Sequence, residues 1–397
     1  MSAQNKPIAC VYIPRFAVEA ERMRRPETAS QLILIGDATV LDCSLGADAS
    51  GVRRGMRMSE AIGLCHRAEV LPPDAPYYER LLDEVLDELQ TLSPTVERGE
   101  LGLAWLSLAG LPVQMETFAE DLIAGMHRRF GFMSSVGAAN GKFVSRVAAV
   151  IARPGAARIV PPADEREFLA NLPVEHLPAS EAMRWRLNLL GVATVGEVAA
   201  FPLGAFQAQF GQEGKRCWQL AQGIDDEPLV PRVKEDAVVR RLQLPAPIAA
   251  LDTILVGVER LLRAAYGDHS RGCRWVRKAV VRAALDGGGS WELPVPFREA
   301  LSDPRDAWSA VKAAVVRHPP ERPVEELEVE LVGLSYESGK QASMFEGKGR
   351  LWQQVEEAVR QLGAQRDRPS LGKVMQVDPQ SRIPERRAAL LAMESDV

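Results

Sequence analysis

The sequence predicts a multidomain α+β fold. Up to about residue 155, strand-like runs alternate with helical patterns. From about residue 163 to 225 the apolar spacing is helical throughout, and a second mixed region follows. A chain of 397 residues is long enough for two to four domains, at a prior of about 150 residues each.

The first region owes its α+β character to four apolar runs: ACVYI, QLILIG, GLAWLSL and FMSSVGAA. Between the second and third runs, six apolar residues recur at helical spacing: Leu81, Leu82, Val85, Leu86, Leu89 and Leu92. The helical region is broken by LP, GV and FP pairs, so it is expected to be a bundle of short helices: EREFLANL, EAMRWRLNLLG, TVGEVAAF and RCWQLAQG.

The charged, proline-punctuated stretch DDEPLVPRVKEDA, residues 225 to 237, predicts a linker. Beyond it, helix, strand, helix and strand patterns run to about residue 336 and predict a third, α+β domain. The remainder opens with the polar, glycine-flanked YESGKQASMFEGKGR and ends with the arginine-containing SRIPERRAALL. Between them one amphipathic helix is expected, with its apolar face formed by Leu351, Trp352, Val355, Val359 and Leu362.

Composition narrows the classes of function. A net charge of -5 excludes a uniformly basic nucleic-acid coat, so any contact with DNA must come from a local patch. The 5 cysteines form no C-x-x-C pair and are odd in number, which predicts reduced thiols and no zinc site. The N-terminus lacks the pattern of a signal peptide, and no run of about 18 apolar residues occurs. We expect a cytoplasmic protein.

Several segments, in order and at matching separations, resemble Y-family translesion DNA polymerases across roughly residues 8 to 336. The segments are CVYIPRFAVEAE, GVRRGMRMSEA, VERGELGLAWLSLAGL, SSVGAANGKFVSRVAAVIARPG and the helical block from LPVEHLP to LAQGIDDEP. The resemblance implies a right-handed polymerase architecture with a ferredoxin-like palm, small fingers, a helical thumb and an α+β little finger. The implied bounds are 1–21 and 73–162 for the palm, 22–72 for the fingers, 163–228 for the thumb, 229–238 for a linker, 239–336 for the little finger and 337–397 for a tail that binds the clamp and partners.

The resemblance also marks where catalytic carboxylates belong. In the family the first segment carries two aspartates, and Tyr12 and Pro14 stand at their positions, although Glu21 matches a family glutamate. The third segment of the family pairs an aspartate with a glutamate, where this chain has Gly102 and Leu103. Two-metal phosphoryl transfer needs hard oxygen ligands, which these four side chains do not supply. We therefore expect no catalytic residue and no cofactor.

Two acids keep an alternative open. Glu97 matches a glutamate that active relatives also carry, and Glu100 would reach the aspartate position if its strand shifted by two residues. An active polymerase that uses these acids with Mg²⁺ is therefore the competing hypothesis. The nucleotide side argues against it, because Leu45 and Asp48 stand where the family has a tyrosine and an arginine for the triphosphate.

The pattern of losses resembles the catalytically inactive ImuB-type accessory proteins of bacterial mutagenesis cassettes, which commonly carry an apolar-Pro-Arg sequence, as in VYIPRF. This resemblance implies an adaptor in the DNA damage response that recruits an error-prone polymerase, together with a recombinase-like accessory protein. A protein-only scaffold that has also lost DNA binding is a third hypothesis.

Contacts with DNA are expected on the third domain and the palm. The stretch SRGCRWVRKAVVRAALD concentrates Arg271, Arg274, Arg277, Lys278 and Arg282, and strand periodicity places Arg274, Lys278 and Arg282 on one face. Lys142 and Arg153 match basic palm positions of the family, with solvated helix charges as the alternative. The turn at Leu189 to Val192 resembles a helix-hairpin-helix, although its glycine signature is reduced to PAS at 178 to 180. A protein with these contacts would be associated with the nucleoid.

A short peptide follows the third domain. QASMF, residues 341 to 345, resembles the bacterial sliding-clamp motif, with Gln341 at the edge of the pocket and Met344 and Phe345 as its apolar anchors. An ordinary connector with a partly buried Phe345 is the alternative.

Overall fold

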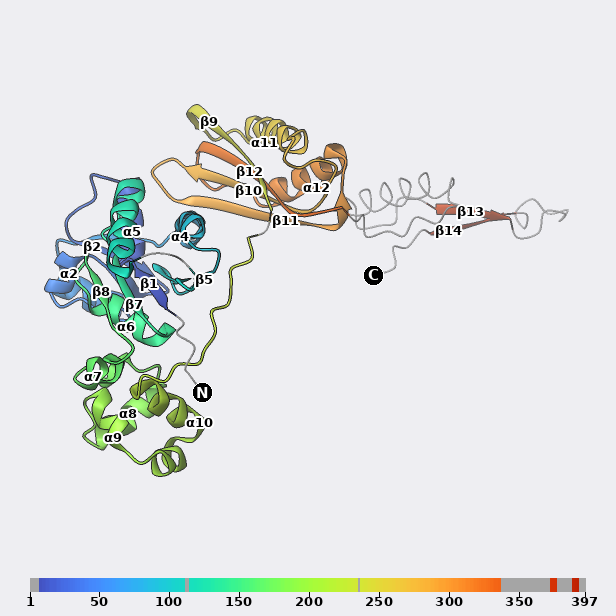
Figure 1. Ribbon diagram of the computed structural model, residues 1–397. Coiled ribbons are helices and arrows are strands. Elements are labelled where there is room, and N and C mark those ends of the chain that lie inside the picture. The colour runs from blue at the N-terminus through green and yellow to red at the C-terminus, as the bar shows by residue number, and fades with distance from the viewer. Residues whose placement is uncertain (1–6, 111–113, 235, 337–371, 377–387, 393–397) are drawn as a thin grey trace. The chain divides into compact units, whose positions relative to one another are not determined.

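The computed structural model describes residues 7–110, 114–234, 236–336, 372–376 and 388–392 (Figure 1). The chain divides into two compact units, with the boundary between Leu334 and Ser335. Residues 341–345 and the helix expected at 351–362 lie outside the described residues.

A five-stranded sheet of order β5-β6-β1-β7-β8 organises the first region. Its strands are β1 (Ile8–Tyr12), β5 (Val96–Arg98), β6 (Leu103–Ser107), β7 (Ser135–Ala139) and β8 (Ala157–Ile159). β1 lies in the centre and pairs antiparallel with both β6 and β7. Because its sequence IACVY is apolar at successive positions, both faces of β1 can be covered by helices.

Helices cover the two faces of this sheet. On one face, α4 (Ala75–Leu92) and α5 (Met115–Phe130) pack with Ala9 and Val11 into the largest core. On the opposite face, α6 (Lys142–Ile151) packs against β1 and β7, and Ala149 of this helix contacts the cluster around Cys10. The alternation of Ala9, Cys10 and Val11 between two cores is the period of two that the sequence predicts for a strand.

A smaller α+β segment is inserted after β1. It contains a three-stranded sheet of order β3-β2-β4, built from β2 (Leu32–Gly36), β3 (Thr39–Cys43) and β4 (Glu69–Leu71). The accompanying helices are α1 (Phe16–Arg24), α2 (Leu45–Ala49) and α3 (Met58–Leu64). Ile33, Val40 and Val52 form its separate small core.

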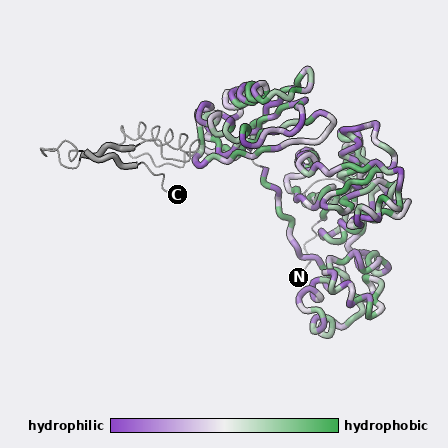
Figure 2. Tube along the Cα trace, turned by 180° about the vertical axis from the view of Figure 1, so that it is seen from behind, coloured by the Kyte–Doolittle hydropathy of each residue, from purple (hydrophilic) through white to green (hydrophobic). Residues whose placement is uncertain are grey.

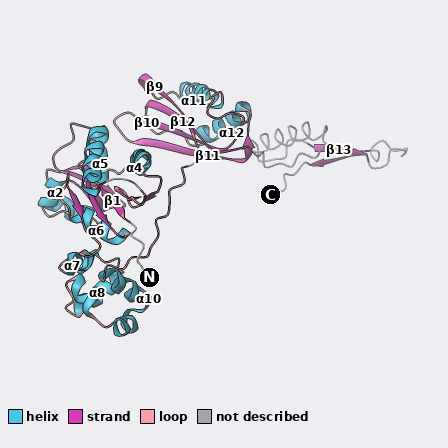
Figure 3. Ribbon diagram, in the orientation of Figure 1, coloured by secondary structure: helices cyan, strands magenta, loops and turns pink. Residues whose placement is uncertain are grey.

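The described residues from 163 to 223 contain helices only (Figure 3), as the sequence predicts. They are α7 (Glu165–Ala170), the 3₁₀ turn η1 (Val174–His176), α8 (Glu181–Leu189), α9 (Val195–Ala200) and α10 (Leu203–Ala221). Polar caps set the starts: Ser180 accepts from the backbone of Met183, and Thr194 forms a capping box with Glu197. These helices share one core with Phe143, Val144 and Val147 of α6, so this bundle is fixed to the sheet through that helix.

The third region is a four-stranded sheet of order β11-β10-β12-β9 with two helices. Its elements are β9 (Val238–Ile248), α11 (Leu251–Tyr266), β10 (Trp275–Leu285), β11 (Ser290–Leu301), α12 (Pro304–Arg317) and β12 (Val324–Ser335). The expected helix, strand, helix, strand order was therefore incomplete, because β9 and β11 were missed. Both are edge strands and both contain prolines, which are confined to sheet edges because proline donates no ladder hydrogen bond.

In the second unit, β13 (Gly372–Gln376) and β14 (Ala388–Ala392) form an antiparallel pair of strands.

Hydropathy along the trace shows apolar residues running through the strands and helices of the larger unit (Figure 2). Among the described residues, none of the helices combines the length and the apolar character needed to cross a membrane.

Candidate functional site: a polymerase-like palm without metal ligands

The positions at which the resemblance places catalytic carboxylates lie together at one edge of the sheet. The register of β1 and β6 sets Tyr12 opposite Leu103. Just beyond, the backbone N–H of Ile13 donates to the carbonyl of Gly102 at 2.7 Å. The strands therefore bring the four positions together as expected, while Pro14 ends β1 by removing a donor.

The side chains at this edge pack instead of coordinating. Tyr12 is half-buried against a small cluster formed by Cys10, Leu103 and Ala149. In the described part of the chain, no group of three or more His, Cys, Asp or Glu residues has the arrangement of a metal site. The residues present at this edge do not fit Mg²⁺, which prefers carboxylate and other hard oxygen ligands.

Gly102 closes this edge sterically as well as chemically. Its φ is +82°, in the left-handed region that glycine occupies without strain. A Cβ at this position would lie 2.5 Å from the carbonyl oxygen of Ile13 and 2.8 Å from Cβ of Phe16. The backbone has therefore closed over the position where the resemblance expects an aspartate.

Glu21, the acid that matches the family in the first segment, has a structural partner set. Its side chain is 1% exposed, and Arg24 donates to both of its oxygens at 2.7 and 2.9 Å. The hydroxyl of Tyr78 also donates to it, at 2.8 Å. Both bonds from Arg24 come from Nη2, while its Nη1 donates to Asp74 at 2.6 Å, so this arginine joins α1 to the start of α4.

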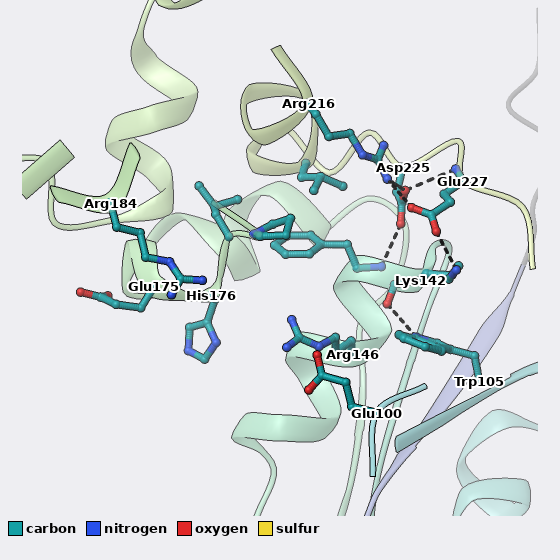
Figure 4. A pocket seen from close by; sticks show the side chains of 14 residues that line it. Glu100, Trp105, Lys142, Arg146, Glu175, His176, Arg184, Arg216, Asp225 and Glu227 are labelled. Carbon is teal, nitrogen blue, oxygen red and sulfur yellow. Dashed lines mark hydrogen bonds and ion pairs between the residues drawn. The ribbon is translucent and has the colours of Figure 1, made fainter. Parts of the chain in front are cut away.

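Lys142 is neutralised by two carboxylates (Figure 4). Its Nζ lies 2.6 Å from Glu97 Oε1 and 2.7 Å from Glu227 Oε1. The side chain also lies over the ring of Trp105, with Nζ 5.0 Å from the ring centroid. Burial disfavours the ammonium charge, but the hydrogen bonds to Glu227 and Glu97 outweigh it and raise the pKa of Lys142. The ammonium group is therefore committed to protein partners.

The stretch expected to be a plain linker carries these contacts. Asp225 accepts from the backbone N–H of Phe143 at 2.8 Å, at the start of α6, and pairs with Arg216 at 2.6 Å. Glu97, through its second oxygen, accepts from the backbone N–H of Val230 at 2.7 Å. Residues 225 to 230 are thus tied to the sheet and to α10, and Glu97 has no oxygen left without a partner.

Glu100 lies in the turn between β5 and β6. Its carbonyl accepts from the backbone N–H of Leu103 at 2.9 Å, which fixes the turn in the register that sets Leu103 opposite Tyr12. The exposed Glu100 side chain lines a cavity between α6 and the helical bundle. The two-residue shift that would move Glu100 to the aspartate position is absent from this register.

The two positions that the resemblance assigns to triphosphate contact, Leu45 and Asp48, lie on α2, and Asp48 forms ion pairs. Asp48 lies 3.1 Å from the guanidinium of Arg15 and 2.7 Å from that of Arg53. Arg15 itself adopts a left-handed conformation with φ 53°, which is uncommon for a residue other than glycine. Leu45 is 65% exposed beside this cluster on α2. Asp48 therefore joins the inserted segment to the end of β1 through its ion pair with Arg15.

The cations expected on the third domain differ in how far they are neutralised. Arg282 is 13% exposed and lies 2.7 Å from each of Glu292, Glu328 and Glu330. Burial opposes its charge, but Glu292, Glu328 and Glu330 outweigh that effect and raise the pKa of Arg282. Lys278 lies four positions earlier on β10, on the same face, opposite Pro296 of β11. Arg277 is exposed at the bulge between Val276 and Lys278.

Arg274 and Arg271 lie in the turn before β10, so the expected alternation along one strand does not extend to Arg274. Arg274 pairs with Asp236 at 2.5 Å and donates to the carbonyl of Ser270 at 2.6 Å. Arg271 donates to the carbonyl of Tyr266 at 2.9 Å and lies over its ring. Both arginines therefore also hold the turn, which shortens the face that periodicity predicts.

Arg153 and the expected helix-hairpin-helix turn are exposed. Arg153 follows the end of α6. At the turn after α8, Gly191 has φ +71° and Leu189 and Leu190 are 67% and 58% exposed. The PAS stretch provides the N-cap Ser180, whose backbone N–H donates to Glu213 at 2.5 Å. This stretch therefore starts α8 with a serine cap.

Comparison with known proteins gives the family. Residues 11–150 match the impB/mucB/samB family. DNA polymerase IV of Desulfatibacillum aliphaticivorans is 27% identical over 246 residues, which is 60% of this chain and 62% of that protein. DNA polymerase IV of Methanoculleus marisnigri is 29% identical over 237 residues, 57% of this chain and 66% of that protein. The likeness to this family rests on residues 11–150 and on these relatives.

Solved structures agree on the fold of this chain. DinB from Sulfolobus solfataricus matches with a TM-score of 0.52 and 18% identity, over 83% of this chain and 99% of that one. An insertion ternary complex of Dbh DNA polymerase matches with a TM-score of 0.52 and 19% identity, over the same 83% and 99%. The chain spans 62% and 66% of the length of the two curated relatives named above. The α+β, Y-family fold predicted from the sequence is confirmed.

Sequence reasoning missed three residues whose ion pairs hold the candidate site together: Asp225, Glu227 and Arg15. Asp225 and Glu227 fix Arg216 and Lys142, although they fall in the stretch that was interpreted as a linker. The acidic run DDE was the available signal, because carboxylates commonly pair with cations or lie at helix N-termini. Arg15 had no such signal, since its partner Asp48 is distant in sequence.

Proposed function

We propose that this chain is a non-catalytic, polymerase-like adaptor that binds primer-template DNA and helps to recruit an error-prone polymerase to damage. The observation that carries the proposal is the sheet edge at which Tyr12 faces Leu103 and Gly102 contacts Ile13. Two-metal phosphoryl transfer at this edge would need carboxylates that hold two Mg²⁺ ions. None of the four positions, Tyr12, Pro14, Gly102 and Leu103, carries a carboxylate, and Gly102 has no space for a Cβ. These features favour a scaffold over an enzyme.

The nucleotide side supports the same proposal. An incoming triphosphate needs cationic donors, and Arg15 and Arg53 are already paired with Asp48. Lys142 is likewise paired with Glu97 and Glu227. A nucleotide would have to replace these intramolecular partners before it gained any interaction.

DNA contact is proposed through the remaining cations. Arg153, Arg277 and Lys278 have no side-chain ion pair within the described residues, so they are the best placed to approach phosphates. Structures with the same fold include an insertion ternary complex and a post-insertion binary complex of Dbh DNA polymerase, which favours a substrate-binding role for the fold. Attachment to the sliding clamp is proposed through Gln341, Met344 and Phe345. Two weak attachments on one template would raise the local concentration of the recruited polymerase.

The proposed parts keep the bounds given from the sequence: palm 1–21 and 73–162, fingers 22–72, thumb 163–228, linker 229–238, little finger 239–336 and tail 337–397. ImuB-type accessory proteins are the proposed functional class. The partners are an error-prone polymerase and a recombinase-like accessory protein, with a cytoplasmic, nucleoid-associated location.

An active translesion polymerase is the second candidate, because the named relatives are DNA polymerases IV. It would have to use Glu97 or Glu100. Glu97 is held by Lys142 and by the backbone of Val230, which leaves Glu100 as the testable acid.

The test is primer extension with Mg²⁺ or Mn²⁺ and all four nucleotides, run beside DNA binding of the same preparation. We expect binding without extension for the unaltered chain and for Glu100→Gln alike. Metal-dependent extension that survives purification and is lost with Glu100→Gln would establish an enzyme and end the adaptor proposal. Absence of both binding and extension would favour the protein-only scaffold.

A further inference from the structure

A cavity of about 440 Å³ lies between α6 of the palm and the helices of the bundle (Figure 4). Its volume is in the range of about 300–1,000 Å³ that small-molecule sites occupy. The palm and the bundle share one hydrophobic core through α6, so the walls of this cavity are held in place. It lies apart from the Asp48 cluster at the nucleotide side, which is formed by other elements.

On one wall of the cavity, both cations are already paired with carboxylates of the protein. Lys142 is paired with Glu97 and Glu227, and Arg216 is paired with Asp225 and Glu227. The three carboxylates exceed the two cations by one negative charge, so this wall does not attract an anion. A ligand therefore gains little from this wall beyond its shape.

The opposite wall carries two arginines, Arg146 and Arg184, whose charge is not offset by a bonded partner within the described residues; burial lowers the pKa of the neighbouring His176 and favours its neutral form. Arg146 on α6 is half-buried and lines the cavity, and no hydrogen bond or ion pair of its side chain occurs within the described chain. A guanidinium that is partly removed from water without a partner is costly. Arg184 of α8 and His176 of η1 line the same wall. Figure 4 shows these side chains on the side of the cavity away from Asp225 and Glu227.

The cavity also has apolar walls. Trp105 and Phe143 contribute aromatic rings, and Leu177 and Leu220 contribute aliphatic surface. Trp105 is held by a hydrogen bond from its Nε1 to the carbonyl of Lys142 at 3.1 Å. A bare anion would leave these walls unused, whereas an anion that carries a flat organic group would contact them.

We propose that this palm–bundle cavity binds an organic phosphate monoester, with the phosphate on Arg146 and Arg184 and the organic group against the apolar walls. Guanidinium groups bind phosphate through paired N–H donors, which favours a ligand with a phosphate group over an uncharged apolar ligand. Two sources present this chemistry: a free nucleotide and the phosphorylated end of a DNA strand. The site is independent of catalysis and of the proposed DNA contacts on the little finger.

Two acids limit the affinity and sharpen the test. Glu100 and Glu175 are exposed at the same cavity and repel an anion. Removing the charge of Glu100 should therefore tighten phosphate binding, whereas a metal role for Glu100 predicts the opposite for any metal-dependent ligand. This makes Glu100→Gln a gain-of-binding variant.

The experiment is isothermal titration calorimetry of the full chain with dAMP, deoxyadenosine and inorganic phosphate in turn. We expect dAMP to bind and both fragments to bind more weakly. Arg146→Gln should weaken dAMP binding about tenfold, because a charge-assisted hydrogen bond is lost. Arg146→Lys should retain part of the affinity, and Glu100→Gln should tighten binding about two- to threefold.

Arg128→Gln is the matched control, since Arg128 is an exposed arginine on α5 outside the cavity and should leave binding unchanged. Unfolding curves of each variant separate loss of the site from loss of the fold. The proposal fails if dAMP does not bind at millimolar concentration, if Arg146→Gln binds as the unaltered chain does, or if inorganic phosphate binds as tightly as dAMP. Oligonucleotides with a 5′-phosphate or a 5′-hydroxyl then identify the source: a preference for the phosphorylated strand indicates a strand end, and none indicates a free nucleotide.

Discussion

The β1–β6 edge of the first sheet and the sheet of the third region both present little free charge, for different reasons. At the β1–β6 edge, Tyr12 and Leu103 are packed side chains without an ionised group. On the sheet of the third domain, Arg282 is retained but is bonded to Glu292, Glu328 and Glu330. At the first site there is no ionised side chain that could bind a metal ion. At the second, the charge of Arg282 is present but stabilises the sheet through its ion pairs. The predictions below separate these two cases, from the largest expected effect to the smallest.

Arg282→Met should have the largest effect on stability. The substitution leaves Glu292 and Glu330 without this cation and leaves Glu328, which is only 7% exposed, with Arg241 in place of two arginines. Breaking a buried charge pair in this way costs about 3–5 kcal/mol of unfolding free energy. Urea denaturation measures the loss.

The exposed Arg277 on the same strand is the control, and Arg277→Met should change stability by less than about 0.5 kcal/mol. The double variant Arg282→Met with Glu328→Leu should regain part of the loss. Equal stability of Arg282→Met and the unaltered chain would mean that this charge cluster is solvated and not structural.

Gly102→Ala should destabilise the palm by about 2–4 kcal/mol, from left-handed backbone strain together with overlap on Ile13 and Phe16. Gly110→Ala isolates the first of these costs, because Gly110 has φ +79° and no atom within 4 Å of its would-be Cβ. It should cost about 1–2 kcal/mol. If the two variants were equally stable, the palm edge would be open enough to accept a side chain, and a carboxylate could be restored there.

Lys278→Gln should give the smallest effect, a weakening of DNA binding by a few-fold. If Lys278 contacts a phosphate, the slope of log affinity against log salt should fall in magnitude by about 1. Lys312→Gln on α12 is the control on the helical side of this domain and should leave the slope unchanged. An unchanged slope for Lys278→Gln, and for a variant that neutralises Arg274, Lys278 and Arg282 together, would support a scaffold without DNA contact through this face.

The sequence predicted the parts of the fold that local patterns specify. β2, β6 and β7 fall within three of the apolar runs, β1 overlaps the fourth with a shift of one residue, and α7, α8 and α9 fall within the short helical patterns. The remaining helical pattern is the second half of α10, which is merged with an earlier segment across a kink at Gly211. Among the missed strands, β9 and β11 carry prolines, and a sheet accepts these only at its edges. Whether a strand will be an edge depends on neighbours that are distant in sequence.

The candidate site divides in the same way. Residue identity alone determined that Tyr12, Pro14, Gly102 and Leu103 lack metal-binding carboxylates, because ligand chemistry belongs to the side chain whatever its position. Only the tertiary structure decided which charges remain available. Lys142 and Arg146 lie four residues apart on α6, yet Lys142 meets two carboxylates and Arg146 meets none within the described chain. Coulomb interactions depend on distance in space, and Glu227 reaches Lys142 only because the chain folds back across the palm.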